Sequence, residues 1–215
     1  NASAGFSIVT FTTPGSLPGT IGHGLNAEPH MIITKSRGAA GGWGVYHKSI
    51  GNTNLLLLNG TNASTSGPNQ WNSTTPTSTV FSIGTDYATS ATYVAYVFSP
   101  VDGYSSFGSY TGNGSTDGPF VYTGFRPRWV MIKGYDASSD AWKIYDTSRS
   151  SYNVMGDFLS PNNSNAEVTN NTNSMDMLSN GFKMRSPGST DSNYSGYRYI
   201  YAAFAESPQK FSRAR

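Results

Sequence analysis

Short stretches of β-branched and aromatic residues alternate along the chain with clusters of Gly, Pro, Asn and Ser. Short apolar runs bounded by such turn residues predict strands. In the first half of the chain the expected strands are Phe6–Thr12, Met31–Lys35, Gly42–His47, Asn54–Leu58, Val80–Ile83 and Thr92–Phe98. In the second half they are Phe107–Tyr110, Trp129–Lys133, Ala141–Tyr145, Asp157–Leu159, Gly181–Met184 and Tyr197–Ala205. The pattern predicts an all-β protein.

The two halves repeat one another. Pro29–Lys35 returns as Pro127–Lys133, and Trp43–Tyr46 returns as Trp142–Tyr145. Two later pairs keep the order, Phe81–Ile83 with Phe182–Met184 and Tyr93–Phe98 with Tyr199–Phe204. The separation between matching residues grows only from 98 at Pro29 to 106 at Phe98, which indicates that strands were retained while loops gained residues. The repeated unit is therefore a folded module rather than a short solenoid period.

The duplication predicts the domain organisation. We expect a first β repeat at 1–103 and a second at 104–215, forming either two β-sandwiches or one larger sandwich with pseudo-twofold symmetry. The join, Pro100–Ser106, is short and contains no flexible Ser/Gly run. We therefore expect the two repeats to pack as one rigid unit.

The charged residues differ between the copies. His30 lies opposite Arg128, His47 opposite Asp146, and Asp140 opposite the Gly-rich stretch of the first copy. A duplicated active site would repeat its nucleophile, base or ligands, and no set of Ser, His and Asp does so. We expect a scaffold protein without catalytic residues or cofactors, and not an enzyme.

Composition narrows the class of protein. Charged residues make up 12% of the chain, against roughly 25% in an average soluble protein. A surface built from Ser, Thr, Asn, Gly and Tyr is typical of extracellular β-rich fibres and adhesins. The net charge of +2 does not indicate nucleic-acid binding. The absence of Cys excludes thiolate metal sites and disulfides, and no apolar run is long enough for a membrane span.

The spacing of the His, Asp and Glu residues does not indicate a metal site or a catalytic carboxylate pair. His23, His30 and His47 show no ligand spacing typical of a metal site. The loops Asn113–Gly118 and Asp136–Asp140 offer oxygen ligands but lack the further acidic residues of a strong calcium site. The glutamates mark no carboxylate pair of the kind that glycoside hydrolysis needs. We predict no metal site and interpret both loops as turns.

Two long polar loops, Gly60–Thr79 and Pro161–Thr172, occupy matching places in the copies, and binding residues often lie on loops. The first loop contains an aromatic residue flanked by amides, at Asn69, Gln70, Trp71 and Asn72. An indole that stacks on a sugar ring, with amides that bond its hydroxyls, is suited to glycan recognition. Alternatively, Trp71 covers the edge of the core. We consider the four residues a candidate ligand-binding site.

Several long segments resemble a domain that recurs in tail-fibre and other virion proteins of phages, especially marine and cyanobacterial phages. They are Tyr93–Phe98, Gly103–Gly114, Asp117–Pro127 and Tyr199–Pro208, and the resemblance covers essentially the whole chain. It implies an extracellular place on a virion, contacts with other virion subunits and a homo-oligomer, with a trimer favoured by the habit of fibres. Near Phe98–Pro100 the chain departs from this family, in which Cys or Ala is usual.

Three functions are compatible with these observations. The leading hypothesis is a non-enzymatic virion appendage domain, a tail fibre or fibre tip, that binds a host-surface polysaccharide. The alternative is a purely structural virion module, such as a capsid decoration or tail-shaft protein, without a host ligand. A depolymerase ranks third, because it would need a groove with two carboxylates.

Overall fold

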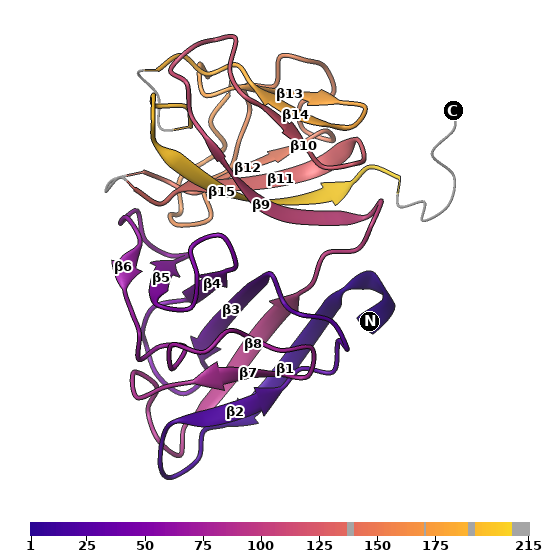
Figure 1. The fold of residues 1–215 in the computed structure, drawn as a ribbon. Coiled ribbons are helices and arrows are strands. Elements are labelled where there is room, and N and C mark those ends of the chain that lie inside the picture. The colour runs from indigo at the N-terminus through magenta and orange to yellow at the C-terminus, as the bar shows by residue number, and fades with distance from the viewer. Residues whose placement is uncertain (137–139, 170, 189–191, 208–215) are drawn as a thin grey trace. The chain divides into compact units, whose positions relative to one another are not determined.

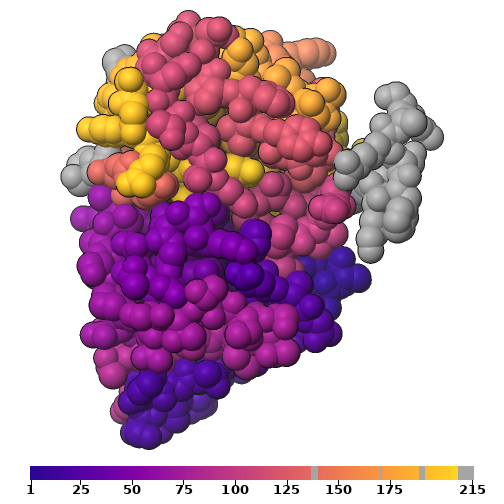
Figure 2. Space-filling model, in the orientation of Figure 1, coloured from indigo at the N-terminus to yellow at the C-terminus, as the bar shows by residue number. Residues whose placement is uncertain are grey.

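The computed structural model describes residues 1–136, 140–169, 171–188 and 192–207 (Figure 1). The chain divides into two compact units, Asn1–Pro100 and Val101–Arg215, which we name unit 1 and unit 2. Figure 2 shows one face of the surface in the same colours, with unit 1 in indigo to magenta and unit 2 from there to yellow. Apart from one short 3-10 turn, η1 (Ala2–Ala4), every regular element in the described residues is a strand, so the all-β prediction is confirmed.

Unit 1 contains a six-stranded antiparallel sheet in the order β1-β8-β3-β4-β5-β6. Its strands are β1 (Phe6–Thr12), β3 (Met31–Ser36), β4 (Gly44–His47), β5 (Asn54–Leu57), β6 (Thr65–Ser66) and β8 (Thr92–Phe98). Strand β8 lies between β1 and β3 and pairs with both over most of its length. The first strand of the unit, β1, therefore pairs with its last strand, β8.

A second, two-stranded sheet in unit 1 pairs β2 (Gly19–Gly22) with β7 (Val80–Ile83). Ile21 on β2 and Phe81 on β7 join Ile32 and Val97 of the large sheet in one buried cluster. Apolar side chains recur at every second residue of β8, so Ala95 and Val97 point to this core from the same face. Unit 1 is thus a two-layer sandwich with its own core.

Unit 2 repeats this plan. Its larger sheet has the order β12-β11-β15-β9 and its smaller sheet the order β10-β14-β13. The strands are β9 (Ser105–Thr111), β10 (Phe120–Tyr122), β11 (Pro127–Gly134), β12 (Lys143–Asp146), β13 (Met175–Leu178), β14 (Gly181–Met184) and β15 (Arg198–Ala205). Val121 and Phe182 of the small sheet meet Val130 and Tyr201 of the large sheet in a second core cluster. Each unit therefore forms a sandwich with a separate core.

At one pair of corresponding positions the two cores differ in which strand carries the larger side chain. In unit 1, Val9 on β1 pairs with Ala95 on β8. In unit 2 the corresponding pair is Gly108 on β9 and Tyr201 on β15. A Cβ atom at Gly108 would lie 2.8 Å from the Tyr201 hydroxyl oxygen, so only glycine leaves room for this tyrosine. A large residue on one strand is thus matched by a small residue on its partner, as close packing requires.

The expected strands form with small shifts at their ends, except Asp157–Leu159, which makes only isolated bridges to Val168 and Ile144. The sequence prediction missed four strands, β2, β6, β10 and β13. β2 and β10 are short and follow Pro18 and Pro119, so their Gly and Pro residues indicate turns. The packing of the two repeats as one rigid unit stays a prediction.

Candidate functional site

Unit 1 contains a surface groove of about 630 Å³. One part of its lining is the glycine-rich segment between β3 and β4, residues 36–44, which we name the glycine-rich wall, and another is the segment 86–93 that leads into β8. The two segments are joined where Ser36 pairs with Tyr93. Leu55 and Leu57 of β5 and Gln70 of the first long loop complete the lining. The groove therefore collects four segments that are distant in the sequence.

Lys35, near the end of β3, stabilises the glycine-rich wall that follows this strand. Lys35 Nζ donates hydrogen bonds of 2.8 Å to the carbonyl oxygens of Ser36 and Ala39. The Ala39 amide in turn donates to Ser36 Oγ at 3.2 Å. Two of the three donors of the ammonium group thus stabilise the loop from within.

Two glycines of this wall pack closely against other residues of the lining. A Cβ atom at Gly42 would lie 2.8 Å from Leu57 Cδ2, and one at Gly44 would lie 3.0 Å from Gln70 Nε2. Larger residues at these positions would displace the leucine and the glutamine. Gly42 and Gly44 therefore allow this wall to lie close to Leu57 and Gln70.

Gln70 links the groove to the core. Its side chain hydrogen-bonds the hydroxyl group of Tyr87, which also lies 3.0 Å from Thr34 Oγ1. Burial raises the pKa of Tyr87 well above its ordinary value, against the smaller opposing effect of these hydrogen bonds. The carboxamide of Gln70 is therefore oriented by a buried neutral phenol.

The loop that carries Gln70 is closed tightly against the turn after β7. The Gly84 amide donates to the Gln70 carbonyl oxygen at 3.1 Å. A Cβ atom at Gly84 would lie 1.9 Å from the Asn69 carbonyl oxygen, a distance that no side chain tolerates. Gly84 is thus required for the approach of the two backbones.

The structure separates the four predicted site residues. Asn69 and Asn72 are exposed, and Gln70 is half-buried at the groove. Trp71 is 1% exposed and makes edge contacts with Tyr46 and Tyr87 at centroid distances of 5.8 and 6.5 Å.

The burial of Trp71 corrects one part of the sequence interpretation. Its ring faces lie in the core, so a sugar cannot stack on this indole in the structure, whereas the alternative of Trp71 as a cover of the core agrees with its position. Its Nε1 atom is buried without a hydrogen-bond partner among the described residues. Ligand binding by Asn69, Gln70 and Asn72 stays a prediction.

The charge of the groove comes from one residue. Among the described residues that line it, Asp86 alone has a charged side chain, and that residue is exposed. The other polar side chains of the lining are neutral and belong to Ser36, Gln70, Ser90, Thr92 and Tyr93. The groove is therefore a neutral to weakly acidic, hydroxyl-rich site.

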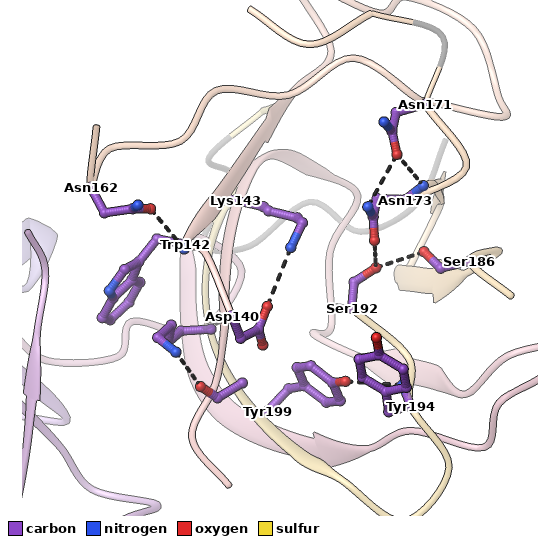
Figure 3. A network of polar contacts seen from close by, with 12 residues as sticks. Asp140, Trp142, Lys143, Asn162, Asn171, Asn173, Ser186, Ser192, Tyr194 and Tyr199 are labelled. Atoms are coloured by element: carbon purple, nitrogen blue, oxygen red, sulfur yellow. Dashed lines mark hydrogen bonds and ion pairs between the residues drawn. The ribbon is translucent and has the colours of Figure 1, made fainter. Parts of the chain in front are cut away.

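Unit 2 places charged side chains where unit 1 has glycines. Lys143 pairs with Ile132 across β12 and β11, as Gly44 pairs with Thr34 across β4 and β3. Its Nζ lies 3.4 Å from Asp140 Oδ1, and the two side chains are only 2% and 5% exposed. Figure 3 shows them pointing toward one another. The ammonium also lies 5.8 Å from the centroid of the Phe158 ring. Here the side chain of Lys143 occupies the core.

A second polar cluster in unit 2 is satisfied internally. Ser192 Oγ lies 2.7 Å from Ser186 Oγ and donates to Asn173 Oδ1 at 2.9 Å (Figure 3). The hydroxyl of Tyr110 donates to the Ser192 carbonyl oxygen, and burial raises the pKa of Tyr110 well above its ordinary value. Because its members bond one another, this cluster serves the fold.

The remaining sequence candidates do not assemble into a site. In the parts of the chain that the structure describes, no three His, Asp or Glu residues are placed to hold a metal ion. His23 hydrogen-bonds the Thr77 carbonyl oxygen and the Leu25 amide. The loop Asp136–Asp140 lies in part outside the described residues. None of the helices in the described segments has the length and apolar character to cross a membrane.

The sequence prediction missed the glycine-rich wall and Asp86 as parts of a groove. The available signal is the contrast between the glycines of the first copy and Asp140 of the second, which by itself favours a scaffold without catalytic residues.

Comparison with known proteins identifies the family but no characterised relative. No curated protein and no solved structure gives a significant match. Residues 1–208 match the family described as a domain of unknown function, DUF7483. Because this match spans nearly the whole chain, the protein belongs to the DUF7483 family.

Proposed function

We propose that this chain is a non-enzymatic phage virion appendage domain, a tail fibre or fibre tip on the outside of the particle. It binds a host-surface polysaccharide through the groove of unit 1. The observation that carries the proposal is the groove itself, in which neutral hydrogen-bonding groups lie beside the apolar side chains of Leu55 and Tyr93. The resemblance of four long segments to virion domains supports its location.

The chemistry of the groove fits a sugar chain. Sugars present hydroxyl groups at their edges and apolar C–H faces, so a site needs both hydrogen-bonding groups and apolar surface. The carboxamide of Gln70 and the hydroxyls of Ser90 and Thr92 supply the first, and Leu55 and Tyr93 supply the second. The volume of about 630 Å³ lies within the usual range of ligand sites.

Repetition of the site on the particle is part of the proposal. A homo-oligomer, with a trimer favoured for a fibre, and attachment to other virion subunits would bring several grooves to one cell surface. Linked weak sites bind with an avidity that exceeds the single-site affinity by about 10²–10⁴. A shallow groove with moderate affinity is therefore sufficient for host attachment.

The test alters the groove in two ways, by blocking its exposed wall and by removing the Gln70 carboxamide, which also removes a hydrogen bond to the buried Tyr87. In Ala40→Trp an indole replaces a methyl group on the exposed glycine-rich wall, and Ala2→Trp adds the same group outside the groove. A second matched pair is Gln70→Ala, inside the groove, and Asn69→Ala, next to it on the same loop. Binding to candidate host cells and their purified polysaccharides is measured together with the oligomeric mass and the melting temperature of each variant.

We expect Ala40→Trp and Gln70→Ala to lose saturable binding while Ala2→Trp and Asn69→Ala retain it. Binding that survives Ala40→Trp in a folded protein of unchanged mass would refute the groove as the site. Loss in Asn69→Ala alone would move binding to the loop 69–72. Release of new reducing ends from the polysaccharide by the purified chain would refute the non-enzymatic part of the proposal.

Exposed aromatic residues in unit 2 favour a second candidate, the structural virion module. Phe120 and Tyr122 on β10 are 46% and 62% exposed, and Tyr152 is 86% exposed. Exposed aromatic side chains are typical of contacts between subunits. This candidate predicts that Phe120→Ser/Tyr122→Ser lowers the oligomeric mass measured by analytical ultracentrifugation, and that no host polysaccharide binds the assembled wild-type oligomer.

A further inference from the structure

Because the module is duplicated, the groove of unit 1 can be compared with the corresponding positions of unit 2. The residue of unit 2 at the position of Gly44 is Lys143, because both begin the strand that pairs with the repeated Met31–Lys35 or Trp129–Lys133 segment. Two residues before the shared tryptophan, unit 1 has Gly41 and unit 2 has Asp140. The glycines of unit 1 thus stand where unit 2 has an ammonium and its carboxylate partner.

Lys143 and Asp140 show which chemical groups the fold can hold at the position that Gly44 occupies in unit 1. In unit 2 the Lys143 stem leads to an ammonium that lies beside the Asp140 carboxylate and the Phe158 ring (Figure 3). In unit 1 a Cβ atom at Gly44 would point toward Gln70 Nε2, Thr34 Oγ1 and Leu55 Cδ1, at 3.0, 3.2 and 3.4 Å. The direction that the lysine stem follows in unit 2 therefore leads in unit 1 to the lining of the groove.

Among the described residues that line the groove, Asp86 supplies the one carboxylate and none supplies a cation, and the exposed Arg37, between Ser36 and Gly38, is not part of the lining. Asp86 lies in the lining, whereas Lys35, the cation of the adjoining strand, donates to two carbonyl oxygens of the glycine-rich wall. An anionic sugar in the groove would meet Asp86 without a compensating positive side chain in the lining. A ligand amine would meet a carboxylate, as Lys143 does in unit 2.

We propose that the groove of unit 1 recognises a glycan that carries a free amino sugar, with the ammonium group of the sugar next to Asp86. This inference rests on the proposed function and specifies its ligand. The exposed position of Asp86 limits the contribution of the pair to at most about fivefold in affinity. Hydrogen bonds and apolar contacts along the groove supply the rest of the binding.

The test uses sugar oligomers that differ in one substituent. Glucosamine oligomers carry free amines, N-acetylglucosamine oligomers carry neutral acetamides, and oligogalacturonate carries carboxylates. Each is titrated calorimetrically into the wild-type chain, Asp86→Asn and the control Asp102→Asn, which removes an exposed carboxylate outside the groove. We expect the wild type and Asp102→Asn to bind the free amine more tightly than the acetamide, by up to about fivefold, and the uronate most weakly. In Asp86→Asn the preference for the amine should disappear.

The outcomes separate this inference from the proposed function. A preference for the amine that salt weakens and Asp86→Asn removes supports it, because exposed charge pairs are screened. Tighter binding of the uronate, or an amine preference that persists in Asp86→Asn, overturns it. If no oligomer binds while host-cell binding is still lost in Ala40→Trp, the amine inference fails and the proposed function stands. If cell binding persists in Ala40→Trp, the proposed function fails as well.

Discussion

The buried ion pair of unit 2 gives the sharpest prediction about stability. Lys143 and Asp140 lie 3.4 Å apart with side chains that are 2% and 5% exposed. The change Asp140→Ala removes the carboxylate and leaves the ammonium of Lys143 in the interior. Loss of one partner from a buried pair costs about 3–5 kcal/mol, because the remaining charge stays desolvated. For a unit of this size the melting temperature should fall by roughly 10–20 °C.

A double-mutant cycle isolates the origin of this loss. In Asp140→Ala/Lys143→Met both charges are absent, and the flexible methionine retains most of the lysine stem against Phe158. Because replacement of a buried pair by apolar groups is often close to neutral, the double variant should recover most of the lost stability. The free energies of unfolding are measured by calorimetry and by guanidinium denaturation.

The matched control is the exposed pair Arg149–Glu167, whose side chains are 39% and 33% exposed. Glu167→Ala should change the free energy of unfolding by at most about 1 kcal/mol. The reasoning is refuted if Asp140→Ala costs less than about 1 kcal/mol. It is also refuted if the double variant is as unstable as the sum of the two single variants.

Three further predictions concern unit 1, each read from denaturation curves. Trp71→Ala should cost about 3–5 kcal/mol, because a large buried ring leaves a cavity, and a loss below about 1 kcal/mol would contradict its core position. Gly84→Ala should cost about 1–3 kcal/mol, since its Cβ would meet the Asn69 carbonyl oxygen. Gly38→Ala, whose Cβ would make an ordinary contact of 3.9 Å with Thr92 Oγ1, should change stability by less than about 0.5 kcal/mol. Burial lowers the pKa of His23 below 6.5, so the unfolded chain binds the proton first and stability should fall as the pH drops below that value. His23→Gln should flatten this dependence, and an unchanged pH profile in the variant would contradict the assignment.

The strands with strong local patterns could be predicted from the sequence. Thr92–Phe98, a run of β-branched and aromatic residues, is confirmed without change as β8. β2 and β10 were missed because their few residues lie beside prolines, and their hydrogen bonds come from β7 and β14, which lie far away in the sequence. Short strands of this kind depend on the partner strand and not on local propensity.

The candidate site was only partly predictable for the same reason. Gln70 was among the predicted residues and lies at the groove, but Asp86 and the glycine-rich wall carry no local signal of a site. Trp71 illustrates the opposite error, since a tryptophan between amides in a polar loop has the pattern of a surface contact and is buried. Burial of a loop residue is decided by what packs over it.

The sequence by itself determined the duplication, the all-β class and the contrast between glycines in one copy and an Asp and a Lys in the other. Those properties follow from residue order and side-chain type, which are local quantities. The tertiary structure alone decided that residues 36–44 and 86–93 line one groove, whereas Lys143 is buried in the second unit. Both arrangements depend on contacts between residues distant in the chain, and these form only when strand pairing and core packing bring the segments together.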